Sequence, residues 1–87
     1  MSPSSFAFKL TVPNDPDSVT IIGEVAVHAA TYATLDAAAA EAFAGRAKTA
    51  AFKAMQAGHP ATLVVFAAAD GTLTATIDDE SVSQPLA

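Results

Sequence analysis

The chain of 87 residues has no cysteine and no tryptophan, and only four of its residues are basic. Without cysteine, disulfides, thiolate nucleophiles and cysteine-ligated metals are excluded. The four Lys and Arg residues stand against nine Asp and Glu, which gives a formal net charge of −5. Nucleic-acid binding needs clustered basic side chains that neutralise phosphates. The composition therefore argues against direct binding of DNA or RNA, and it favours a protein partner with a basic surface.

Long apolar runs are also missing. The longest, residues 61–69, is interrupted by Thr62 and is far shorter than the roughly 20 residues that a membrane span needs. The N-terminus has no basic region followed by an apolar stretch, so no secretory signal is visible. We therefore expect no membrane association and a cytoplasmic location.

Alanine, by contrast, is abundant, with 22 residues. A buried alanine removes little apolar area from water, so the five phenylalanines and the Val, Leu and Ile residues must supply most of the core. So small a core invites further burial in an oligomer or a complex. Residues 1–5 and 79–87 are polar and lack apolar periodicity. We expect a flexible N-terminus, a single domain over 6–78 and a flexible acidic C-terminal tail.

Two stretches near the N-terminus alternate between apolar and other residues, as half-buried strands do. Residues 6–12 place Phe6, Phe8, Leu10 and Val12 on one side, and the pattern continues over 19–29 after a loop rich in Pro and Asp. This pattern predicts a hairpin of two strands joined by residues 13–18.

A helix is predicted over residues 35–57. Thr34 suits the N-cap, while Gly58 and Pro60 end the helix. An alanine-rich stripe around Phe43 forms the apolar face at 3.6 residues per turn. Phe52 projects onto the polar face between Lys48 and Gln56, unless a kink at Gly45 turns it inward. Phe52 is therefore either a core residue or an interface residue.

Residues 62–68 are apolar on both faces, which predicts a central strand. Asp70-Gly71 is typical of a two-residue hairpin turn, and residues 72–78 alternate again. The expected fold is α+β, with the order ββαββ and a four-stranded antiparallel sheet that carries one helix packed on one face.

The uncovered face of such a sheet would be rich in threonine with an apolar centre, which suggests a second layer from a partner or a second copy. The apolar centre is either Val64 with Phe66 or Leu63 with Val65. The other residues expected on this face are Lys9, Thr11, Thr20, Ile22, Glu24, His28, Thr72, Thr74 and Thr76.

No pattern of catalytic or metal-binding residues is present. His28 shares a strand face with Glu24 but has neither an orienting carboxylate nor a visible pocket. Two histidines 31 positions apart, without cysteine, make no metal-ligand pattern. We therefore predict no catalytic residue, no cofactor and no metal ligand. The residues predicted to contact a partner are Asp15, Asp17, Ile22, Glu24, His28, Phe52, Asp78 and Asp79.

Two family resemblances concern residues 34–77. The segment Ala-Thr-Leu-Val-Val-Phe-Ala-Ala-Ala-Asp-Gly-Thr-Leu, which closes the ββαββ order, resembles small bacterial families without assigned function. The acidity, the size and the alanine-rich helix ending Lys53-Ala-Met-Gln-Ala-Gly58 are similar to some phage anti-CRISPR proteins. That resemblance implies a stoichiometric inhibitor that occludes a surface of a CRISPR effector, and it transfers no functional residue.

Three functions follow as hypotheses. The first is a non-enzymatic protein-binding module, encoded by a phage or mobile element, that inhibits a larger nucleic-acid-binding complex. The second is a structural domain that forms a homodimer through its open sheet face. The third is a small enzyme or ligand carrier that uses His28.

Overall fold

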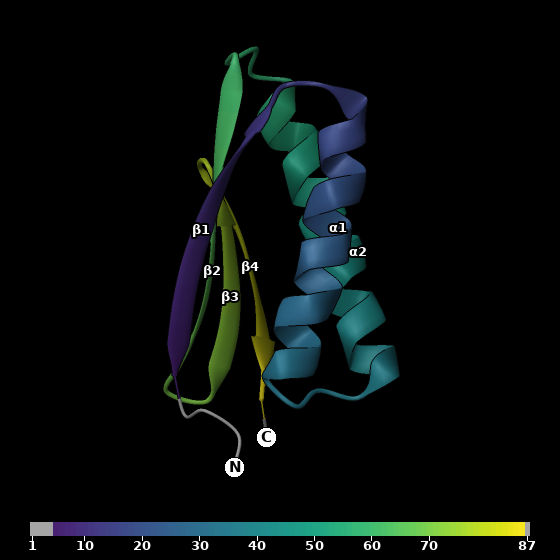
Figure 1. Cartoon of the computed structure of the whole chain (residues 1–87), viewed down its shortest axis with the longest axis vertical. Coiled ribbons are helices and arrows are strands. Elements are labelled where there is room, and N and C mark those ends of the chain that lie inside the picture. The colour runs from purple at the N-terminus through teal and green to yellow at the C-terminus, as the bar shows by residue number, and fades with distance from the viewer. Residues whose placement is uncertain (1–4, 87) are drawn as a thin grey trace.

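The computed structural model describes residues 5–86, which form two layers, a sheet and a pair of helices (Figure 1). The strands form one antiparallel sheet in the order β1-β2-β3-β4, and both helices lie on the same face of it. The α+β class and the four-stranded antiparallel sheet are confirmed, whereas the ββαββ order and the single helix are wrong. The elements in chain order are β1 (Phe6–Pro13), α1 (Pro16–Tyr32), α2 (Ala37–Met55), β2 (Ala61–Ala69), β3 (Thr72–Ile77) and β4 (Glu80–Pro85).

The predicted second strand, residues 19–29, is instead the middle of α1. Asp15 is the N-cap of this helix, and its Oδ1 accepts a hydrogen bond from the Ser18 amide at 3.1 Å. Pro16 follows in the first turn, where a missing amide hydrogen costs nothing. The alternation that indicated a strand coexists with a helical spacing, and this spacing defines the buried face: Ser18, Ile22, Ala26, Ala29 and Ala30.

Helix α2 confirms the predicted helix, with a small shift at its start. Asp36, not Thr34, is the N-cap, and its Oδ1 accepts from the Ala39 amide at 2.8 Å. Thr34 lies in the turn between the helices with a φ of 69°. Gly58 has a φ of 84°, the left-handed conformation expected after the helix. The alanine-rich stripe around Phe43 is buried, as predicted.

The β2–β3 hairpin also agrees with the sequence. β2 lies between β1 and β3, and Asp70 and Gly71 have φ values of 54° and 75°, as a type I′ turn requires. Val64 and Phe66 are fully buried under the helices, so Leu63 and Val65 belong to the open face. This resolves the alternative that the sequence left open.

The expected C-terminal tail is a strand over most of its length. Glu80–Pro85 pairs with β3 along its whole length, and Val82 and Leu86 pack against the core. The Arg46 guanidinium of α2 donates a hydrogen bond to the Gln84 side chain. The predicted flexible tail is therefore wrong for residues 80–86. Residue 87 and residues 1–4 of the predicted N-terminal tail lie outside the described residues.

The core lies between the sheet and the helices and is thin. Of the 19 buried apolar residues, 12 are alanines. Phe43 of α2 and Phe66 of β2 are the largest fully buried side chains, and their ring centroids are 6.4 Å apart in an edge-to-face arrangement. Neither of the helices in the described chain has the length and apolar character that crossing a membrane needs.

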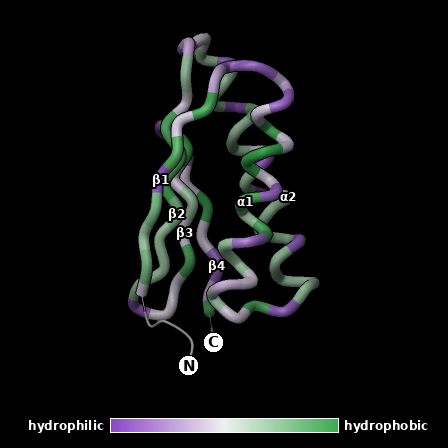
Figure 2. Tube along the Cα trace, viewed as in Figure 1, coloured by the Kyte–Doolittle hydropathy of each residue, from purple (hydrophilic) through white to green (hydrophobic). Residues whose placement is uncertain are grey.

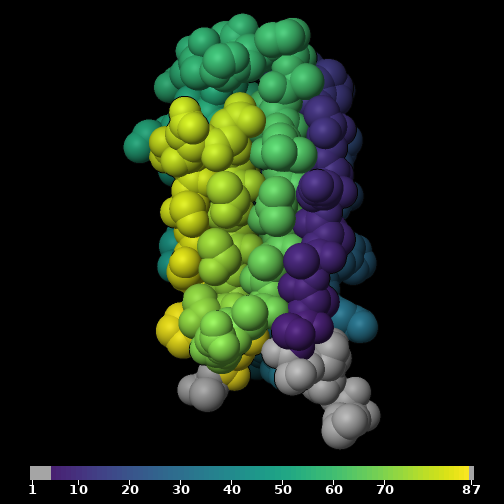
Figure 3. All heavy atoms as spheres, turned by 90° about the vertical axis from the view of Figure 1, so that its left-hand side faces the viewer, coloured from purple at the N-terminus to yellow at the C-terminus, as the bar shows by residue number. Residues whose placement is uncertain are grey.

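Figure 3 looks onto the open face of the sheet, where the four strands lie side by side. Strand pairing places Lys9, Thr11, Leu63, Val65, Thr72, Thr74, Thr76, Ser81 and Ser83 on this face. Thr20, Ile22, Glu24 and His28, which were expected there, belong to α1 instead.

Candidate functional site

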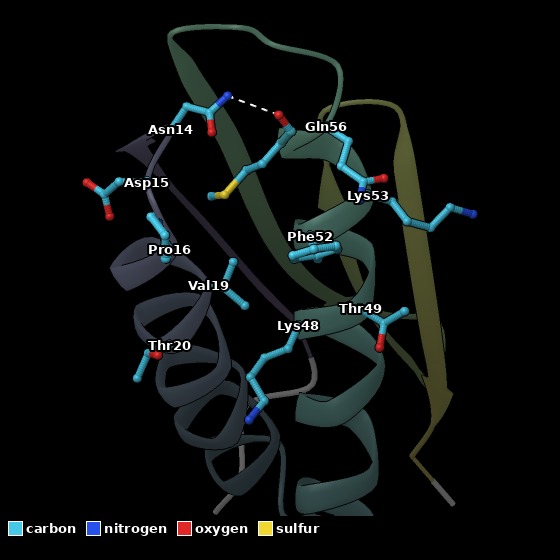
Figure 4. A pocket seen from close by; sticks show the side chains of 11 residues that line it. Asn14, Asp15, Pro16, Val19, Thr20, Lys48, Thr49, Phe52, Lys53 and Gln56 are labelled. Atoms are coloured by element: carbon cyan, nitrogen blue, oxygen red, sulfur yellow. Dashed lines mark hydrogen bonds between the residues drawn. The ribbon is translucent and has the colours of Figure 1, made fainter.

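A groove runs between the first half of α1 and the second half of α2 (Figure 4). It encloses about 740 Å³. Pro16 and Val19 of α1 and Phe52 and Met55 of α2 give it an apolar lining. We call this feature the α1–α2 groove. Its volume lies within the range of about 300–1,000 Å³ that is usual for ligand pockets.

Phe52 is the most prominent side chain of the α1–α2 groove. Its exposed fraction is 59%, so Phe52 is a surface residue and the core alternative is excluded. Phe52 lies between the two helices, whereas the neighbouring Lys53 points toward β4 (Figure 4). The Lys53 Nζ is 3.6 Å from Glu80 Oε1, so its charge is partly offset within the chain.

Lys48 lies across α1 beside the groove. A Cβ built on Gly23 would stand 2.6 Å from Lys48 Cδ, so the absence of a side chain at Gly23 makes room for the lysine stem. The stem therefore covers apolar surface, while the ammonium group remains free to reach solvent. Gly23 thus leaves room for the Lys48 stem against α1.

Asn14 lies just before α1 and links this end of the groove to the end of α2. Its side-chain amide donates to the backbone oxygens of Met55 at 3.1 Å and His59 at 2.7 Å. The Met55 oxygen also accepts from the Gly58 amide at 3.1 Å, so Asn14 adds a second donor there and ties the start of α1 to the end of α2. The sequence around Asn14 indicates only a turn and gives no sign of this role, because the partners are 41 and 45 positions away.

The four aspartates predicted to face a partner lie at one end of the molecule, which we call the acidic end (Asp15, Asp17, Asp78 and Asp79). Asn14 leads into Asp15, and its amide donates to the Pro60 oxygen at 3.1 Å, just before β2. Asp78 and Asp79 line a shallow hollow together with His59 and Pro60. Figure 2 shows this loop between β1 and α1 as hydrophilic.

The four aspartates do not have equal roles. Asp15 caps α1, and Asp78 accepts a hydrogen bond from the Leu63 amide at 3.1 Å. The side chains of Asp17 and Asp79 make no hydrogen bond or ion pair within residues 5–86. Two of the acids therefore stabilise the fold, and the other two can be changed without removing a contact.

The other predicted contact residues do not line the groove. Ile22 is fully buried in the core, so it cannot meet a partner. Glu24 and His28 lie on the exposed surface of α1, four residues apart. Within residues 5–86, no group of three or more His, Asp or Glu side chains is arranged to hold a metal ion.

A second surface of interest is formed by β1 and the flank of α1 that faces away from α2. We call it the β1–α1 side, and its residues are Phe6, Phe8, Ile21, Val25 and Tyr32. Of the five large apolar residues that are exposed in the described chain, three belong to it: Phe8, Ile21 and Tyr32. This surface was not predicted from the sequence, because residues 19–29 were expected to form a strand.

Comparison with known proteins adds no relative. The sequence matches no protein-family model, no curated protein and no solved structure. The resemblance to phage-encoded inhibitors therefore stays a prediction from the sequence.

Proposed function

We propose that the chain is a non-enzymatic protein-binding module whose α1–α2 groove holds an apolar side chain of another protein. The carrying observation is the exposure of Phe52 inside an apolar groove. Aromatic side chains in such settings are enriched among the residues that dominate binding energy at interfaces. Asn14 supports the proposal because it fixes the two walls relative to each other, which reduces the ordering cost of binding.

The acidic end favours a partner whose apolar side chain has basic neighbours. Asp15 lines the groove, and Asp17 follows it on the first turn of α1. Opposite charges across an interface accelerate encounter and suppress wrong partners. The ion pair with Glu80 reduces the opposing effect of Lys53, whereas Lys48, which also lines the groove, keeps its positive charge beside Phe52.

The decisive test compares Phe52→Ala with Tyr32→Ala. Both side chains are 59% exposed, so the two changes remove similar apolar surface from different places. The full chain, immobilised, would capture partners from lysate of its source cell, and each captured protein would then be titrated against the wild type and both variants. We expect Phe52→Ala to weaken binding by about 30-fold, as loss of an interface anchor does, and Tyr32→Ala to leave it within about twofold.

An equal loss of affinity in the two variants, or an unchanged affinity of Phe52→Ala, would contradict the groove as the binding site. Circular dichroism spectra of both variants must match the wild type for the comparison to count.

An inhibitor is the more specific form of this proposal. A stoichiometric binder that covers a surface of a CRISPR effector needs no turnover and no catalytic constellation, which agrees with a groove and an acidic end. The open sheet face is a weaker candidate for a homodimer, because its residues are mostly Thr and Ser with a lysine, Lys9. The hypothesis of an enzyme or ligand carrier using His28 is disfavoured because His28 is not among the residues that line the groove.

A further inference from the structure

We infer that two copies of the chain form a symmetric dimer in which their β1 strands pair antiparallel and their α1 helices meet across the two-fold axis. This inference is independent of the α1–α2 groove. The residues of α1 that line the groove are Pro16, Val19 and Thr20, whereas Ile21, Val25 and Tyr32 of the β1–α1 side lie on the opposite flank of the helix at 3.6 residues per turn. A dimer of this kind therefore leaves both grooves open.

The first observation is the unprotected edge of the sheet. β1 and β4 are the two edge strands, and each pairs with only one neighbour. β4 has the sequence ESVSQP, with a charged residue, polar residues and a proline that discourage further pairing. β1 has the sequence FAFKLTVP, with three large apolar residues and one charge before its final proline. The row of free backbone groups along β1 is thus open to another strand.

The second observation is that apolar side chains flank this edge. Ile21, Val25 and Tyr32 are spaced along one flank of α1 at helical intervals. Tyr32 meets Phe6 edge to face, with ring centroids 5.2 Å apart, and Phe6 stacks on Phe8 at 6.0 Å. A strand that added to β1 would need its own apolar layer to cover these side chains. A second copy supplies both the strand and the layer.

The strand pairing also selects a register. If the two-fold axis is perpendicular to the sheet, even-numbered residues of β1 meet even-numbered residues of the partner, because all of them point toward the helices. An axis at Lys9 would place the two Lys9 side chains directly opposite each other, which destabilises a strand pair. An axis at Phe8 instead places the two Phe8 rings opposite each other, which favours aromatic contact. We therefore assign the axis to Phe8.

The size of the surface agrees with a stable dimer. Figure 1 views the molecule along its shortest axis with β1 and α1 in front, so the whole face that carries these two elements spans the two larger Cα extents, 39 and 21 Å. Stable interfaces bury about 800 Å² on each partner, and a face with these extents is of that order. Because most of the buried apolar residues are alanines, the additional burial would compensate for a thin core.

The first experiment measures the mass of the full chain by size-exclusion chromatography with light scattering, from about 1 µM to about 1 mM. We expect a mass near twice 8.8 kDa at the upper concentrations. Ile21→Lys should shift the chain to monomer, whereas Leu63→Lys on the open sheet face should not. The two side chains are matched, with exposed fractions of 45% and 47%. Tyr32→Lys, on the same flank as Ile21, is the second variant if Ile21→Lys loses its helical circular dichroism.

A monomer at every concentration overturns the inference, and so does a dimer that Leu63→Lys disrupts or that Ile21→Lys and Tyr32→Lys leave intact. Since the groove lies on the other flank of α1, failure here leaves the result for Phe52→Ala unchanged.

The second experiment tests the register by cross-linking. The chain has no cysteine, so an introduced thiol is unique. With the axis at Phe8, the Cα atoms of the two Phe8 residues lie about 5 Å apart, which a disulfide can bridge. The two Lys9 residues are then about 8 Å apart, which is too far. We expect Phe8→Cys to form a disulfide-linked dimer on mild oxidation. Lys9→Cys should form no disulfide between the two copies under the same conditions. Efficient cross-linking of Lys9→Cys, or none of Phe8→Cys, overturns the register.

Discussion

At the scale of single residues, the burial of the Thr62 hydroxyl destabilises the folded chain. Its side chain is fully buried at the start of β2, and its Oγ1 has no hydrogen-bond partner in the described chain. A buried hydroxyl without a partner loses its bonds to water and gains nothing in return. We expect Thr62→Val, which keeps the side-chain shape, to raise the free energy of unfolding by about 1 kcal/mol. Urea denaturation measures this change.

Thr76→Val is the matched control, because Thr76 is exposed on the open sheet face. Its effect should stay within about 0.5 kcal/mol. If Thr62→Val instead destabilised the chain, the hydroxyl would have a partner, such as a buried water molecule.

Residues whose backbone conformation decides their identity are the ones that the sequence predicts well. Asp70 and Gly71 form the predicted turn, and Gly58 has the predicted left-handed conformation, because few residue types tolerate a positive φ. Asn14 could not be predicted in this way. Its role depends on the main chain of Met55 and His59, which only the complete fold brings near it.

At the scale of elements, β4 is the strand that the sequence pattern does not predict. Its residues alternate weakly and are mostly small or polar, so hydrophobic periodicity does not indicate a strand. The strand forms because β3 offers an open edge and because α2 provides contacts: Lys53 with Glu80, and Arg46 with Gln84. Its structure therefore depends on its neighbours more than on its own sequence.

This dependence is reciprocal, so removal of β4 should be costly. A chain ending at Asp79 would lose the pairing with β3 and the packing of Val82 and Leu86. Domains of this size are stable by only about 5–15 kcal/mol in the best cases, so we expect the truncated chain to lose its cooperative thermal transition. Circular dichroism monitors the transition, and Ser83→Ala, which changes only the open face, should preserve it. A cooperative transition at the original temperature would mean that β4 lies outside the folding unit.

Helix α1 shows the opposite failure, because its own sequence was informative but was interpreted with the wrong period. The apolar residues of 19–29 fit a period of two as well as a period of 3.6. The deciding residues precede this segment. Asp15 and Pro16 together are typical of a helix start, with an N-cap followed by proline in the first turn. Both residues were instead predicted to lie in a turn between two strands.

At the scale of the whole molecule, the prediction that one face of the sheet is uncovered is correct. Most of the large exposed apolar side chains, however, lie outside that face. With one helix over the sheet, the open face is the natural place for a partner. With two helices, the apolar residues of α1 gather at its flank, beside the β1 edge and beside α2. Neither the groove nor the β1–α1 side can be predicted without knowing that residues 16–32 are helical.

The net charge of −5 is also a property of the whole molecule, and its distribution can be tested separately from its size. The double variant Asp17→Lys/Asp79→Lys changes the net charge from −5 to −1, because each replacement adds two positive charges. The pair Glu24→Lys/Glu41→Lys makes the same change in net charge away from the acidic end. Glu24 of α1 and Glu41 of α2 line a hollow between the helices together with Lys48. Association rates with a captured partner, measured at low and high salt, distinguish the two.

We expect only the first double variant to slow association, by several-fold at low salt, with little change in dissociation, because charges at the edge of an interface act mainly on encounter. The difference should shrink as ionic strength rises, since the Debye length falls to about 8 Å at 0.15 M. Equal slowing by both pairs would show that net charge alone attracts the partner. No slowing by either pair would remove the acidic end from the binding surface and leave the groove around Phe52 to act alone.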